Sequence, residues 1–190
     1  MKVKNLIYLF LTLFTLNCGE NTHTKSTDSD RKIVDKKKKL EIPEKNKIIV
    51  NIVKKYGSEI SPTYKKAVCT ELVIQVLEKV HDLNDIDKKR IRIITDQNIH
   101  KLLKENSEIP KGIYFSLIKK GIGIPIDHKN EVCEGDFVQF WTESWGHCGI
   151  VKTINPAKNE MELFSSFPST NGYGIQKFNI PEHSFFVRLK

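Results

Sequence analysis

The stretch Gly-Asp-Phe-Val-Gln-Phe-Trp at positions 135–141, followed by Gly-His-Cys-Gly-Ile-Val at 146–151, decides the fold of this chain. Both segments are rich in β-branched and aromatic residues, and a short polar turn separates them. This pattern predicts two neighbouring strands of an antiparallel sheet. The second strand opens on His147, and an imidazole there can act as a general base if a nucleophile packs beside it.

The candidate nucleophile precedes these strands by almost eighty positions. The segment Ala-Val-Cys-Thr-Glu-Leu-Val at 67–73 places Cys69 on the leading edge of a helical pattern. Its apolar positions recur at spacings of three and four: Val68, Leu72, Val73, Val76, Leu77 and Val80. A helix N-terminus and a neighbouring imidazolium both lower the pKa of a thiol. Taken singly, Cys69 would be a buried core cysteine and His147 a strand-end histidine, so the hypothesis depends on the two together.

The remaining patterns divide the chain into helices first and strands second. Helices are predicted at 43–57, 95–103 and 110–121, and a short strand at 91–94, while 123–134 is predicted to be loop. Short strands are predicted at 161–165, 175–178 and 185–189, with a hairpin turn at 155–159. We therefore expect an α+β domain in which N-terminal helices pack on a C-terminal antiparallel sheet.

The first forty-five positions do not resemble a folded domain. Lys2 and Lys4 precede an apolar run at 6–16, which is shorter than the ~20 residues that a membrane-spanning helix needs. The run predicts a secretory signal at 1–17, and Cys18 directly after it resembles the lipidated cysteine of a bacterial lipoprotein. The alternative is plain secretion with Cys18 incidental. Residues 18–45 are polar and predict a disordered tether, which leaves 46–190 as the folded domain. We expect an exported, cell-envelope lipoprotein.

Charge and cysteine content restrict the remaining possibilities. The formal net charge is +8, but no basic patch is interleaved with aromatic residues, so we do not expect nucleic-acid binding. If Cys18 carries lipid, an odd number of cysteines remains, and a Cys133–Cys148 disulfide would leave Cys69 free. The alternative is a zinc site of Cys69, Cys133, His147 and Cys148. Since no CxxC spacing is present, we expect no metal and no cofactor.

Residues 56–178 resemble the NlpC/P60 cysteine peptidases and their CHAP-type relatives, which are papain-like hydrolases of peptide or amide bonds in peptidoglycan. The resemblance lies in the Gly-Asp-Phe-Val-Gln-Phe strand at 135–140, the His-Cys-Gly-Ile strand at 147–150, and Tyr56 upstream of the cysteine. It implies that Cys69 is the nucleophile and His147 the general base. It also places Tyr56 at the border of the substrate site, and Trp145 is a second candidate for substrate binding.

Members of this family have a third polar residue, on the next strand, that orients the imidazole. With the hairpin turn at 155–159, Ser165 is the closest match to that position, and Asn171 is the alternative. A hydroxyl stabilises an imidazolium less than a carboxylate does. The sequence around the nucleophile also departs from the family, with Val-Cys-Thr-Glu at 68–71 where its main branch has Asp-Cys-Ser-Gly.

The sequence thus predicts a membrane-anchored cysteine peptidase or amidase acting on the peptide stems of peptidoglycan without a cofactor. Two further readings remain open beside the zinc site. One is a non-catalytic binding lipoprotein on the same fold. The other is an acyltransferase or lipid-directed thiol enzyme, an activity known in some relatives of this fold.

Overall fold

The computed structural model describes residues 41–190. The predicted signal peptide, Cys18 and most of the predicted tether lie outside these residues. Within residues 41–190, no helix combines the length and the hydropathy needed to cross a bilayer.

In the described part of the chain, five α-helices come before all the strands. They are α1 (Glu44–Ile60), α2 (Cys69–Leu77), α3 (Asp85–Arg92), α4 (Ile99–Lys104) and α5 (Gly112–Lys120), with short 3₁₀ turns at Ile109–Lys111, Lys129–Glu131 and Pro156–Lys158. The predicted core helix begins at Cys69, as its pattern indicated. Gly121 ends α5 in the left-handed conformation, with φ of 80°, which glycine adopts at little cost.

Two local predictions about the helices were wrong. The stretch predicted as a short strand at 91–94 is not a strand. Ile91 and Arg92 end α3 and Ile93 is its C-cap, because Asn84 and Asp87 form a reciprocal capping box that starts a helix there. Gly57 does not end α1, which continues to Ile60. The ring of Tyr173 packs onto Gly57, where a Cβ atom would collide with it.

Six strands form one antiparallel sheet in the order β1-β6-β2-β3-β4-β5. They are β1 (Gly123–Ile126), β2 (Phe137–Trp141), β3 (Gly146–Asn155), β4 (Glu160–Phe167), β5 (Gly172–Asn179) and β6 (His183–Leu189). The predicted α+β class, with helices before an antiparallel sheet, is confirmed. Strand β1 lies where a loop was predicted. It was missed because it is formed by pairing with the distant β6, and its Pro125 is tolerated because β1 lies at the edge of the sheet.

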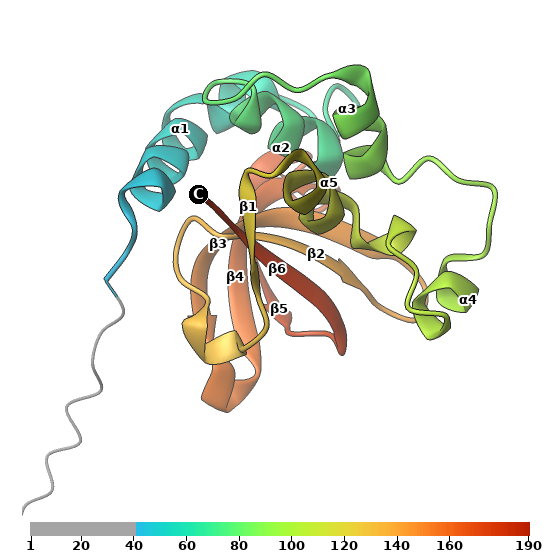
Figure 1. Ribbon diagram of the computed structural model, residues 1–190. Helices are drawn as coiled ribbons and strands as arrows, with labels where there is room; N and C mark the ends of the chain where they lie inside the picture. The colour runs from blue at the N-terminus through green and yellow to red at the C-terminus, as the bar shows by residue number, and fades with distance from the viewer. Residues whose placement is uncertain (1–40) are drawn as a thin grey trace, which may run out of the picture. The chain divides into compact units, whose positions relative to one another are not determined.

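The sheet separates two hydrophobic cores. Helices α1, α2 and α5 cover one face, as Figure 1 shows, and the core there includes Phe137 and Ile150. Alternate residues, such as Val138 and Val151, face the other way into a second core, which is formed largely by the strands themselves. The two-residue period of a strand explains this division. It also places Cys148 on the helical side.

The Gly-Asp pair at the start of β2 has a structural role. The carboxylate of the fully buried Asp136 accepts two hydrogen bonds from the Arg188 guanidinium, both of 2.7 Å, one from the Asn46 side chain at 2.7 Å and one from the Cys133 N–H at 2.8 Å. Gly135 has φ of 89°, and a Cβ on it would lie 2.5 Å from the backbone oxygen of Asn46. Together the pair connects α1, β2 and β6.

Candidate functional site

Cys69 is the first residue of α2, and two serines fix the segment that leads into it. The hydroxyls of Ser61 and Ser166 donate to the Ala67 carbonyl at 2.7 and 2.6 Å and lie 2.8 Å from each other. Both serines are buried. Because Ser166 belongs to β4, these hydrogen bonds connect the start of α2 directly to the sheet. The position of the Cys69 sulfur is therefore set by the sheet as well as by its own helix.

The environment of Cys69 favours a thiolate. A hydrogen bond from the Cys148 thiol makes the largest contribution, and a hydrogen bond and the charge of His147 add to it; together they lower the pKa of Cys69 to about 4. Burial opposes this change, since only 9% of Cys69 is exposed. The backbone N–H of Cys148 also contributes a hydrogen bond. The lowered pKa favours the thiolate of Cys69, which is the nucleophilic form of a cysteine.

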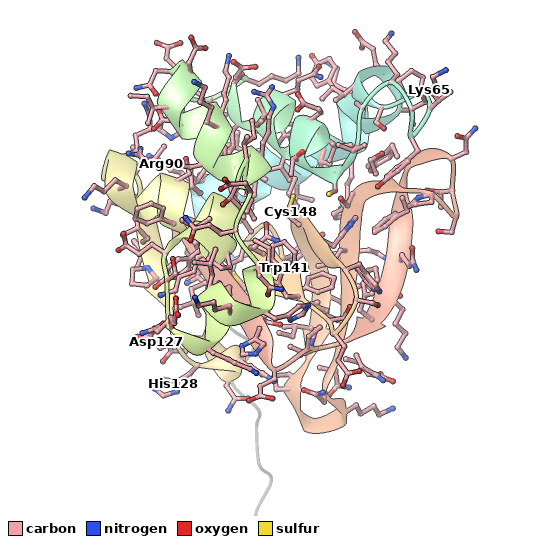
Figure 2. The ribbon with its side chains drawn as sticks, turned by 90° about the vertical axis from the view of Figure 1, so that its right-hand side faces the viewer. Lys65, Arg90, Asp127, His128, Trp141 and Cys148 are labelled. Carbon is pink, nitrogen blue, oxygen red and sulfur yellow. The ribbon has the colours of Figure 1, made fainter. Side chains whose placement is uncertain are left out.

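The neighbouring Cys148 has the opposite behaviour. Its hydrogen bond to Cys69 and its complete burial raise its pKa well above the usual value, so it keeps its proton and donates it toward the thiolate. Figure 2 shows Cys148 just beneath the helices, and Trp141 further down the sheet. One thiol therefore serves as the hydrogen-bond donor of the other.

The third cysteine lies elsewhere. Cys133 contacts Asn46 and Arg188 near the buried Asp136, and burial together with that carboxylate raises its pKa to about 11. All three cysteines within residues 41–190 are free, so the Cys133–Cys148 disulfide is not formed. Because Cys133 is held in this separate cluster, the four proposed zinc ligands do not converge. No group of three or more potential metal ligands occurs in the part of the chain that the structure describes.

His147 is held by aromatic rings. Its imidazole stacks on Phe167 with ring centroids 4.9 Å apart and an interplanar angle of 16°. The rings of Phe140, Trp145 and Phe178 lie 5.8 to 6.2 Å from it. Its Nε2 atom is buried and has no hydrogen-bond partner among the described residues. The ring is thus oriented by packing, whereas the resemblance implied a polar partner.

The structure does not bring Ser165 to His147 as an orienting residue. The Ser165 hydroxyl donates to the Cys148 carbonyl at 2.8 Å. Continuing the pairing of Ile150 with Phe164 toward the start of β3 places Phe167 opposite His147. The position expected from the sequence was short by two residues through miscounting along the hairpin, since a turn at 155–159 pairs 154 with 160 and therefore already places residue 167 opposite 147. The observed pairing of Asn155 with Glu160, shifted by one residue at the bulge near Val151, gives the same partner. Asn171, the alternative, lies exposed in the β4–β5 turn with φ of 48°.

A cavity of about 370 Å³ opens beside His147. Trp145 lines it and is 45% exposed, which is consistent with the predicted substrate-binding position. Tyr64 lines it as well. Burial raises the pKa of Tyr64, and the negative charge of the nearby Cys69 sulfur adds to this increase. Tyr64 therefore lies next to both the nucleophile and the cavity.

Tyr56 does not line this cavity. It packs on the helical core, and the ammonium groups of Lys79 and Lys55 lie 4.2 and 4.9 Å from the centre of its ring. The tyrosine at the site is Tyr64, in the segment between α1 and α2 and only five positions before Cys69. Sequence reasoning passed over it because the spacing to Tyr56 matched the family. The signal available in the sequence was the short separation between Tyr64 and Cys69.

The N-terminus of α2 carries no side-chain cap. Val68 occupies the N-cap position in an extended conformation and its side chain cannot accept a hydrogen bond, whereas α3 and α4 are capped by the side chains of Asn84 and Asn98. The first-turn N–H groups of α2 therefore have no side-chain acceptor. The acidic residue of this turn, Glu71, is engaged by Arg92 in two hydrogen bonds of 2.6 and 3.0 Å.

Sequence reasoning also missed Cys148, Ser61 and Ser166. Cys148 was considered only as a disulfide partner or metal ligand, although it follows His147 directly and alternates to the helical side. Ser61 and Ser166 carried no signal, because their pairing across 105 positions appears only in the folded chain.

No family model, no curated protein and no solved structure matches this chain. The family resemblance therefore depends on the residues quoted above.

Proposed function

We propose that this protein is a papain-like cysteine hydrolase of the NlpC/P60 and CHAP type that cleaves peptide or amide bonds of cell-wall peptidoglycan. The observation that carries the proposal is the convergence of the Cys69 sulfur, at the start of α2, with His147 and Cys148 on β3. This arrangement lowers the pKa of Cys69 to about 4 while Cys148 remains a thiol. A purely structural core cysteine has no need of such an environment.

The reaction follows from these positions. The Cys69 thiolate attacks the carbonyl carbon of the substrate, and the uncapped N–H groups of α2 face the developing oxyanion. As the carbon–nitrogen bond breaks, the His147 imidazolium gives its proton to the leaving amine. Water then attacks the thioester, His147 accepts a proton from it, and the carboxylic acid leaves with the thiolate restored. The residues need no cofactor for these steps.

The substrate and the location of the protein are inferred from the sequence. The Gly-Asp strand and the His-Cys-Gly-Ile strand resemble those of wall hydrolases, and peptidoglycan stems would be the partner. Cys18 would carry the lipid that anchors the chain to the membrane and keeps the domain at the cell envelope. The α+β fold, with a cysteine opening a helix that packs on an antiparallel sheet, supports this proposal.

Digestion of purified peptidoglycan tests the proposal. The full-length chain should release new amino groups from the polymer, and mass spectrometry of the products should identify the bond that is cut. Cys69→Ala should abolish release, while Cys133→Ala, at a thiol in a separate cluster, should not. Release that is equal with the Cys69→Ala protein would contradict the proposal.

A second candidate is a non-catalytic envelope-binding protein on the same fold. The observation that favours it is the buried His147 Nε2 atom, which has no orienting partner among the described residues. This candidate predicts binding to peptidoglycan without product release and with an unreactive Cys69. The digestion therefore separates the two candidates.

A further inference from the structure

The cavity beside His147 has aromatic walls. Tyr64, Trp145, Phe167 and Phe178 line it, and Trp145 and Phe178 approach each other with ring centroids 6.1 Å apart. Apolar walls of this kind bind groups that gain from leaving water. The exposed face of Trp145 offers a ring surface of the sort that usually has a binding partner.

Among residues 41–190, no Lys, Arg, Asp or Glu side chain lines the cavity, and His147 is the one lining residue that carries charge in the proposed reaction. The polar groups that line it besides the tyrosine and the histidine are Ser169 and Gln176, which hydrogen-bond each other at 3.0 Å. Charged residues make up 28% of the sequence, so their absence here is a specific feature of the cavity. A carboxylate bound in it would lose hydration, and the one cation on the lining, the His147 imidazolium, already faces the negative sulfur of Cys69.

We propose that this cavity binds an uncharged, apolar group that flanks the scissile bond of the substrate. The inference depends on the proposed hydrolase, whose nucleophile lies next to Tyr64 and His147. A volume of about 370 Å³ lies at the small end of the range for ligand sites and suits one large side chain or a short acyl chain. The carboxylates of a peptide stem would have to lie outside the cavity.

Alkylation of Cys69 by matched electrophiles tests this. The full-length chain is treated with iodoacetamide, N-benzyl-iodoacetamide, N-octyl-iodoacetamide and the anionic N-carboxymethyl-iodoacetamide, and peptide mapping measures modification at Cys69. Each rate is divided by the rate with free cysteine. Burying an aromatic ring is worth about 1.5–3 kcal/mol, so an apolar reagent should be favoured over iodoacetamide by roughly ten- to a hundredfold. The anionic reagent should gain nothing.

Variants locate the effect. Trp145→Ala and Gln176→Glu should each reduce the apolar preference several-fold, the first by removing a wall and the second by adding a charge. Ile175→Ala is the matched control, because Ile175 neighbours Gln176 on β5, is 46% exposed and does not line the cavity. It should leave the preference unchanged. A stronger gain with the benzyl reagent supports a side-chain-sized group, and a stronger gain with the octyl reagent an acyl chain.

Two failures are distinguishable. Equal normalised rates for all four reagents, or a preference for the anionic one, would overturn this inference even if Cys69 reacts fast. A slow, ordinary-thiol rate with iodoacetamide that still shows the apolar preference would support the cavity assignment and contradict the proposed hydrolase.

Discussion

The ring of Phe167 lies flat against the imidazole of His147, with centroids 4.9 Å apart and an angle of 16° between the planes. Continuing the strand pairing also places the two residues opposite each other on β3 and β4. In the hydrolases that this chain resembles, a polar group on the neighbouring strand orients the histidine. Here an aromatic face occupies that place, and Nε2 is left without a partner among the described residues. The imidazole is held by stacking.

The stacking contact predicts a specific loss of reactivity. Phe167→Leu keeps most of the apolar volume but removes the flat face, and aromatic pairs are worth about 0.5–1.5 kcal/mol. We expect alkylation of Cys69 at pH 6 to slow by roughly two- to tenfold. Phe164→Leu is the control, since Phe164 is equally buried on the same strand but faces the helical core. Equal slowing in both variants would mean that general loosening, and not the His147 contact, is responsible.

Cys148 should control the acidity of Cys69. Cys148→Ala removes the thiol that makes the largest contribution to the low pKa of Cys69. A hydrogen bond to a charged group is worth about 1.5–3 kcal/mol, so the midpoint of the alkylation profile should rise by roughly one to two pH units. Cys148→Ser keeps a donor and should shift it less. An unchanged alkylation profile in Cys148→Ala would mean that Cys148 does not lower the pKa of Cys69. Cys133→Ala is the control and should leave the profile unchanged.

The burial of the Asp136 carboxylate should depend on its ion pair with Arg188. Arg188→Met leaves a fully buried carboxylate without its cation and should lower the free energy of unfolding by about 3–5 kcal/mol. Lys152→Met, which breaks the exposed pair with Glu162, should cost less than about 1 kcal/mol. Urea denaturation monitored by circular dichroism measures both. Similar costs for the two variants would show that Asp136 is stabilised without Arg188.

Two glycines with similar backbone angles should respond differently to alanine. Gly135 and Gly121 have φ of 89° and 80°, so both substitutions impose about 1 kcal/mol or more of backbone strain. At Gly121 the new methyl group meets nothing within 4 Å, whereas at Gly135 it collides with Asn46. The Gly135→Ala protein should therefore have the clearly lower melting temperature in a thermal scan. Matching temperatures would mean that α1 moves away from β2 at little cost.

Local patterns were sufficient where a segment's own sequence determines its structure. The helix starting at Cys69 and the strand pair that holds His147 follow from apolar spacing and β-branched content, and the order of helices before strands follows from them. Strand β1 could not be predicted, because it is formed by pairing with β6 more than sixty positions later. The error at Ser165 has a different origin, since counting correctly from the predicted turn at 155–159 already pairs 147 with 167, the partner that the structure shows.

The candidate site was predictable to a similar extent. His147 is among the groups that lower the pKa of Cys69, and Trp145 lines the adjacent cavity. Tyr64 and Cys148 could not be assigned, because their roles arise from side chains that meet only after α2 packs on β3.

The most direct test of an activated Cys69–His147 pair is the rate of Cys69 alkylation by iodoacetamide between pH 3 and pH 9. Because the pKa of Cys69 is lowered, its thiolate is lost only as the pH falls through about 4. The rate should therefore rise near pH 4 and stay level up to pH 8, and His147→Ala should move the rise to higher pH. A rate that rises only near pH 8.5, the value for an ordinary thiol, in both proteins would contradict the account.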